Sequence, residues 1–148
     1  MRLPRALAAF AALALTGCAG QPAYPVLSAP AATVFRAPCE AVWNATLQSL
    51  GVTPLRLVDR PQGHIVTEHF SYTMPVQAAA RRGGSVATQV LWVSLDILVR
   101  PTAEGATAVQ AQTTIHNALE YGLWSGPGGP NSPEGDLFAR IDARLLRR

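Results

Sequence analysis

The chain has 148 residues, with 12 Arg, no Lys, and 9 Asp and Glu, which gives a formal net charge of +3. This length allows one domain of ordinary size. The basic residues gather in only two small clusters, Arg81–Arg82 and Arg147–Arg148, so the broad basic stripe of a nucleic-acid-binding protein is excluded. Because no apolar run reaches the roughly 18 residues that cross a bilayer, we expect no membrane-spanning helix.

Residues 1–17 have the organisation of a bacterial signal peptide. Arg2 and Arg5 supply a positive start, and Ala6–Thr16 supplies 11 mostly apolar residues, too few for a membrane span. Removal of this segment leaves 10 basic and 9 acidic side chains, so the remaining chain is nearly neutral. The segment leads into Leu15-Thr16-Gly17-Cys18.

The motif Leu15-Thr16-Gly17-Cys18 resembles the lipobox of bacterial lipoproteins. The resemblance implies that Cys18 carries a diacylglycerol, that cleavage occurs just before it, and that the new amino group receives a further acyl chain such as palmitate. Two or more acyl chains hold a protein firmly on a membrane. Ala19 stands where an Asp would favour the inner membrane, so the resemblance implies the periplasmic face of the outer membrane. Residues 18–32 are uncharged and rich in Pro and Ala, which predicts a short, semi-extended tether.

The next segment predicts a strand followed by a helix. Thr33–Arg36 is a short strand, and Pro38 stands where a helix begins, since its missing N–H costs nothing in the first turn. Residues 39–50 carry an apolar stripe of helical period, and Gly51 is a plausible C-cap. The stripe consists of Cys39, Trp43, Leu47 and Leu50.

Beyond this helix the apolar period changes to two. The pattern predicts strands at 53–59 and 64–73, joined by a turn at 60–63 and followed by a long loop at 74–88. Val90–Arg100 is the clearest strand, because every odd position is aliphatic while the even positions are mixed.

The last part of the chain predicts a returning strand, a loop and a helix. Ala106–His116 alternates as a strand should, and residues 122–135 hold five Gly and three Pro, which is typical of a loop. Ser132 and Pro133 are the predicted N-cap and first residue of a terminal helix. Its apolar positions recur every four residues at Leu137, Ile141 and Leu145.

Together these elements predict one α+β domain over residues 33–148. It has an antiparallel sheet of about five strands with two helices on one face, in the order β-α-β-β-β-β-α. This order resembles the helix-grip domains of BamC-type outer-membrane lipoproteins. The local sequences that carry the resemblance are Pro38–Thr46, Asp59–Arg60 and Gly63–Thr67. That family assists the machinery that inserts β-barrel proteins. The resemblance therefore implies a helix-grip-like fold and a place in an envelope complex.

No arrangement of catalytic residues emerges. Cys39 is the thiol left after lipidation, yet no local signature links it to any of the three histidines. His64 and His69 lie five residues apart on one predicted strand, so we expect them on opposite faces. No pair among the histidines and Glu68 has a recognised metal-ligand spacing, and the carboxylates share no motif. We therefore expect no enzyme, no metal ligands and no cofactor.

Surface side chains are the remaining candidates for function. The candidate partner surface consists of Trp92, Asp96 and Arg100 on the mixed strand face, with Tyr121 and Trp124 beside the glycine-rich loop. Exposed aromatic residues commonly anchor protein interfaces, although Trp92 and Trp124 would equally fit a second small core. The leading expectation is a membrane-anchored, non-catalytic scaffold or accessory subunit of an envelope complex, of which β-barrel assembly is one example.

Two alternatives stay open. A carrier of a lipid or other apolar ligand would hold it between helix and sheet, in a cavity lined by Trp43, Leu47, Leu95 and Leu145. The other alternative is a thiol-dependent activity at Cys39.

Overall fold

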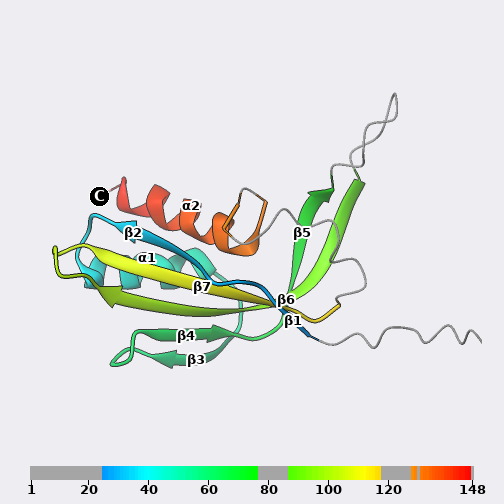
Figure 1. Cartoon of the computed structure of the whole chain (residues 1–148), viewed down its shortest axis with the longest axis horizontal. Helices are drawn as coiled ribbons and strands as arrows, with labels where there is room; N and C mark the ends of the chain where they lie inside the picture. Colours follow the sequence, from blue (N-terminus) through cyan, green and yellow to red (C-terminus); the bar gives the residue numbers. More distant parts are fainter. Residues whose placement is uncertain (1–24, 77–86, 118–127, 130, 148) are drawn as a thin grey trace, which may run out of the picture.

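The structure, a computed structural model, describes residues 25–76, 87–117, 128–129 and 131–147. The strands are β1 (Val26–Leu27), β2 (Ala31–Phe35), β3 (Leu55–Asp59), β4 (His64–Thr67), β5 (Phe70–Val76), β6 (Ala87–Pro101) and β7 (Thr107–Ile115), and the helices are α1 (Cys39–Leu50) and α2 (Pro133–Leu145). In the described part of the chain the strands form one antiparallel sheet in the order β1-β7-β6-β4-β3. β2 also pairs with β7, and β5 with β6 (Figure 1).

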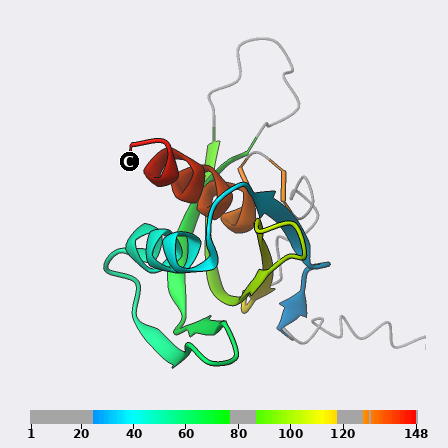
Figure 2. The ribbon, with the colours of Figure 1, turned by 90° about the vertical axis from the view of Figure 1, so that its left-hand side faces the viewer.

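Both helices lie on the same face of the sheet (Figure 2). One hydrophobic core joins Val42 and Trp43 of α1, and Leu137 and Ile141 of α2, to aliphatic side chains of the sheet such as Ile97. Burial of these apolar surfaces is the main favourable term in folding. The predicted α+β class with two helices on one face is confirmed.

Strand β6 divides the two faces of the sheet. Its odd-numbered side chains from Leu91 to Val99 are almost fully buried, whereas the even positions are exposed or half-buried. Leu95 and Ile97 lie in the main core, and Leu91 and Val93 form a second small cluster with Met74 and Ile115. The alternation predicted for this strand is confirmed.

The single strand predicted over 64–73 is wrong, because an extra residue interrupts it. β4 pairs Val66 with Asp96, while β5 pairs Phe70 with Val93, so three residues on one side oppose two on the other. This is the count of a β-bulge. In the gap the Thr67 hydroxyl accepts a hydrogen bond from the Leu95 N–H at 2.9 Å and replaces the missing ladder bond.

The bulge also corrects the expected placement of the histidines. A bulge shifts the side-chain alternation by one residue. His64 Nε2 lies 2.8 Å from Asp96 Oδ1, and the His69 ring stacks on that of His116, which bonds to Ser94. Asp96 and Ser94 share one face of β6, so the prediction that His64 and His69 point to opposite faces is wrong.

The helix ends follow the local sequence. α1 runs over the predicted residues 39–50, after Pro38 and before Gly51, which has φ +58°. At α2, the Ser132 hydroxyl accepts a hydrogen bond from the Gly135 N–H at 3.0 Å, and Pro133 opens the helix as predicted. No helix in the described residues is long and apolar enough to cross a membrane.

Ser28 fixes the N-terminal segment to the domain. Its N–H donates to Thr113 O at 2.8 Å, and its hydroxyl donates to Glu134 Oε1 at 2.9 Å while accepting from the Thr113 N–H at 2.9 Å. Gln112 Nε2 donates to Ser28 O at 2.7 Å. β1 lies inside the segment 18–32 predicted as a tether. The sheet therefore begins at Val26, earlier in the chain than the sequence predicts.

Candidate functional site

The face of the sheet opposite α1 and α2 gathers most of the predicted surface residues. We call it the helix-free face and define it by Val90, Trp92, Ser94, Asp96, Leu98 and Arg100 of β6 with their cross-strand neighbours. Trp92 is 51% exposed and Val90 is 50% exposed. Trp92, Asp96 and Arg100, predicted together from sequence, therefore share one strand and one exposed face.

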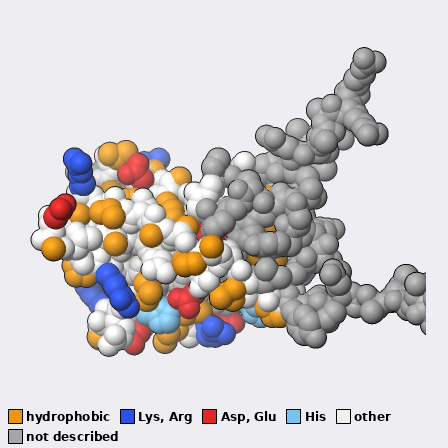
Figure 3. Space-filling model, viewed as in Figure 1, with side chains coloured by type: hydrophobic (Ala, Val, Ile, Leu, Met, Phe, Trp, Pro, Cys, Tyr) orange, Lys and Arg blue, Asp and Glu red, His pale blue; other side chains and the backbone are white. Residues whose placement is uncertain are grey.

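Charged and hydrogen-bonding groups occupy the middle of this face. His64 on β4 pairs diagonally with Asp96 on β6; the His64 side chain is half-buried and that of Asp96 is exposed. An exposed pair of this kind contributes little to stability, but it offers both a donor and an acceptor to a partner. Figure 3 shows histidine and charged side chains together along the lower edge of the molecule, over the β3–β4 region.

A second polar group lies beside the bulge. The rings of His69 and His116 are 3.8 Å apart between centroids and tilted by 38°, and His116 Nε2 lies 3.1 Å from Ser94 Oγ. The pKa of His116 is lowered by its partial burial and then by the nearby His69 and Arg56. The ring is thus held in its neutral form more strongly than an exposed histidine would be.

Among the described residues, the contact between Ser94 and His116 is not accompanied by a third group that orients the histidine as a base. An activated serine needs a base that a third group orients, together with donors for the developing oxyanion. Among the described residues, no carboxylate hydrogen-bonds to His116; its ring contacts His69 and Ser94. In the same part of the chain, no group of three or more His, Cys, Asp or Glu is placed to hold a metal ion.

Asn117 holds the strand that carries Trp92. Its Oδ1 accepts from the Trp92 N–H at 2.8 Å, and its Nδ2 donates to Val90 O at 3.1 Å. The amide side chain of Asn117, two residues beyond the end of β7, thus continues the β-ladder. Trp92 is consequently presented from a fixed backbone, although half of its side chain is exposed.

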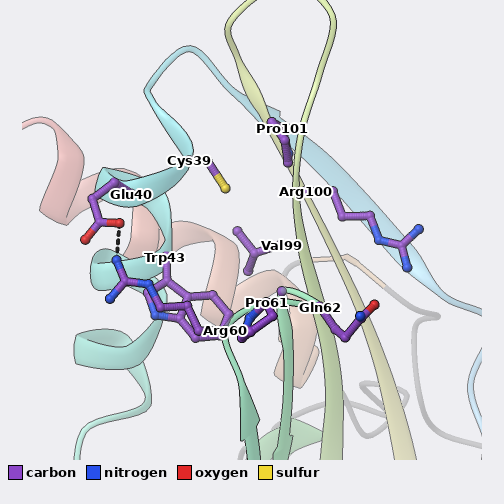
Figure 4. A pocket seen from close by; sticks show the side chains of 10 residues that line it. Cys39, Glu40, Trp43, Arg60, Pro61, Gln62, Val99, Arg100 and Pro101 are labelled. Atoms are coloured by element: carbon purple, nitrogen blue, oxygen red, sulfur yellow. Dashed lines mark hydrogen bonds and ion pairs between the residues drawn. The ribbon is translucent and has the colours of Figure 1, made fainter.

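A cleft of about 590 Å³ opens between the start of α1, the β3–β4 turn and the end of β6. Figure 4 shows the Cys39 thiol pointing into it, the ion pair of Glu40 and Arg60 on one wall, and Arg100 pointing away. No histidine is among the residues that line this cleft, so it brings no base to Cys39. The thiol itself packs half-buried against the main core.

The residues predicted to line a carrier cavity belong to the packed main core or lie against it. Trp43 and Leu95 are buried in the main core, and Leu47 and Leu145 pack against it. A space of about 40 Å³ lies beside Leu95, between the helices and the sheet. Ligand pockets are commonly some 300–1,000 Å³, so this space is too small for a lipid.

Several predicted site residues lie outside the described residues: Leu15, Thr16, Gly17, Cys18, Tyr121 and Trp124. Sequence reasoning missed the stacked pair of His69 and His116, because a one-residue bulge leaves no clear signal in the alternation. It also missed Leu27, which lies on the helix-free face through the register of β1 on β7 and is 61% exposed.

Comparison with the sequence profiles of known protein families finds no match, and comparison with curated proteins finds none either. Among solved structures, TTHA0849 from Thermus thermophilus is similar to 82% of this chain and 98% of its own, at 12% identity and a TM-score of 0.38. Ara h 8.0201 is similar over 84% of this chain and 99% of its own, at 12% identity and a TM-score of 0.39.

Proposed function

We propose that the protein is a lipoprotein anchored through Cys18 to the periplasmic face of the outer membrane. In this proposal its single α+β domain is a non-catalytic scaffold or accessory subunit of an envelope complex, of which β-barrel assembly is one example. The signal peptide and lipobox pattern support the anchor, and the helix-free face supports the binding role.

The single observation that carries the binding role is the composition of the helix-free face. It presents the polar pair of His64 and Asp96 together with the exposed Arg100, on the same face as a half-exposed Trp92. Aromatic residues and Arg are enriched at protein interfaces, where polar groups surround an apolar centre. The partner that fits the His64, Asp96 and Arg100 part of the face is an envelope protein with complementary hydrogen-bonding groups.

Site-specific photo-cross-linking in the native envelope tests this role. Gln110 is exposed on the helix-free face, and Gln48 is exposed on α1, so the two positions form a matched pair. With a photo-reactive phenylalanine at either position of the lipidated protein, we expect one discrete protein adduct from position 110 and none from position 48. Mass spectrometry identifies the adduct and the acyl chains on Cys18. The same adduct from both positions, or none from position 110, would contradict the binding role.

The carrier alternative makes a different prediction in the same experiment. A carrier would be recovered with a stoichiometric lipid and without a protein adduct. Because Leu95 and Trp43 belong to a packed core with a space of about 40 Å³ beside Leu95, such a carrier would have to separate its helices from the sheet.

A further inference from the structure

We propose that one end of the helix-free face rests on the lipid surface to which the protein is anchored. This end consists of Leu27, Ser71, Thr73, Val90 and Trp92, and we call it the uncharged end. The inference rests on the proposed lipid anchor at Cys18, and it assigns to the uncharged end a partner distinct from the protein that would bind near Asp96 and Arg100.

The register of the sheet places the exit of the anchored segment beside Trp92. Val26 pairs with Ile115, so the preceding Pro25 lies next to His116 at the same level of the sheet. The His116 N–H donates to Trp92 O at 2.8 Å, which makes Trp92 the neighbour of His116 on the other side. Two strand spacings of roughly 4.8 Å then separate the backbones of Pro25 and Trp92, a distance of about 10 Å.

The length of the tether keeps this end near the bilayer. Seven positions separate Cys18 from Pro25, and an extended chain spans at most about 3.5 Å per residue, or about 25 Å in total. The hydrogen bonds of Ser28 to Thr113, Gln112 and Glu134 prevent the tether from lengthening at the expense of β1. Glu134 is fully buried, so its bond to Ser28 is shielded from water.

The chemistry of the uncharged end suits a lipid surface. Trp92 presents an amphipathic ring of the kind that favours the membrane–water interface. Val90 is exposed two residues along the same strand, Leu27 is exposed two strands away at the level of Ser94, and the exposed Ser71 and Thr73 lie opposite Trp92 and Val90 on β5. None of these five side chains ionises, and the pKa of His116 beside Trp92 is lowered by its partial burial, which favours the neutral ring; contact with a headgroup layer therefore desolvates no charge on these groups.

The charged side chains of the helix-free face lie toward its opposite end. Asp96 and Arg100 follow Trp92 along β6 by four and eight residues, or roughly 13 and 26 Å at about 3.3 Å per residue. Contact of the uncharged end with lipid would therefore leave the Asp96–Arg100 region facing the aqueous periplasm, where a protein partner can reach it.

Fluorescence quenching in vesicles tests the contact. The mature, acylated protein is inserted into vesicles of phosphatidylethanolamine and phosphatidylglycerol that contain lipids brominated near the headgroup end of the acyl chain. We expect quenching of tryptophan emission that is lost in Trp92→Phe. The difference between the two proteins isolates Trp92 from Trp43, which is buried, and from Trp124.

A matched control uses the opposite end of the same face. Val34 is 60% exposed and pairs with Ala108, the neighbour of Arg100. In Trp92→Phe/Val34→Trp we expect the new tryptophan to be unquenched by the brominated lipid. Equal quenching at positions 34 and 92, or anchored protein with unquenched Trp92, would overturn the surface contact and leave the anchor standing. A mature chain without acyl groups on Cys18 would overturn the anchor and the contact together, and the mass of the N-terminal peptide reports which failure has occurred.

Discussion

Single residues on the helix-free face show how position alone changes their chemistry. His64 and His69 are separated by five positions, yet one pairs with Asp96 and the other stacks on His116. His116 is the more constrained of the stacked pair, because it also contacts Ser94 and is partly buried. We therefore expect protonation of the His116 ring to change the stability of this face as the pH falls.

His116 should make the folded state less stable at acid pH. Its pKa lies below the ordinary value of 6.5, so the proton binds more weakly in the folded chain than in the unfolded one. The stabilising contribution is present above that ordinary pKa and is lost as the pH falls through the lower folded pKa. We expect the free energy of unfolding, measured with urea, to fall less between about pH 7 and pH 5 in His116→Gln than in the wild type. Equal slopes in the two proteins would show that the environment of His116 does not shift its titration.

At the scale of elements, short connections decide how the strands meet. The bulge between β4 and β5 reverses the side-chain alternation. The turn between β3 and β4 contacts β6, the strand with which β4 pairs. In that turn the Gly63 N–H donates to Arg60 O at 3.0 Å, and Gly63 O accepts from the Val99 N–H at 2.7 Å. Gly63 has φ +63°, and a Cβ there would lie 2.1 Å from Val99 O.

Gly63→Ala should therefore be strongly destabilising. The new methyl group would require both a left-handed alanine and a shift of the turn away from β6, so we expect the free energy of unfolding to fall by about 2–4 kcal/mol. Gly105→Ala is the matched control, because Gly105 has φ +73° with no atom within 4 Å of its would-be Cβ. That variant should lose only about 1 kcal/mol. Similar losses in both variants, measured by urea unfolding, would mean that the contact with Val99 is unimportant.

At the scale of the whole molecule, the two helices and the sheet enclose a packed core. Trp43, Leu95 and Ile141 belong to the same buried cluster, with a space of about 40 Å³ beside Leu95. Such a core supports a binding surface better than an internal ligand site, since its side chains already fill the volume that a ligand would need.

Leu95→Ala distinguishes these two functions. Leu95 is 3% exposed, and in a packed core its truncation should lower the free energy of unfolding of the ligand-free protein by about 2–5 kcal/mol. Leu146→Ala serves as the control, because Leu146 is 79% exposed and should cost less than about 0.5 kcal/mol. A small loss in Leu95→Ala, together with altered uptake of an apolar ligand, would favour the carrier.

Much of the fold follows from the sequence because local patterns are strong where one face is buried. Residues 39–50 form the predicted helix, Ser132 caps α2 as predicted, and the odd positions of Val90–Arg100 face the core. These features depend on spacing, capping chemistry and apolar alternation, which are properties of neighbouring residues. The lipobox pattern at Cys18 is likewise a property of the sequence alone, and the anchor it predicts remains to be tested.

The tertiary structure decided what depends on pairing between distant strands. Only the register of β4 and β5 against β6 reveals the extra residue that brings His69 to His116 on the helix-free face. Only the pairing of β1 with β7 brings Leu27 to the level of Ser94, and the preceding Pro25 to the level of Trp92. A one-residue shift in strand pairing moves a side chain to the other face of the sheet, and the sequence of the strand itself gives no clear sign of it. The orientation of a surface toward a membrane or partner is therefore set by the sheet as a whole.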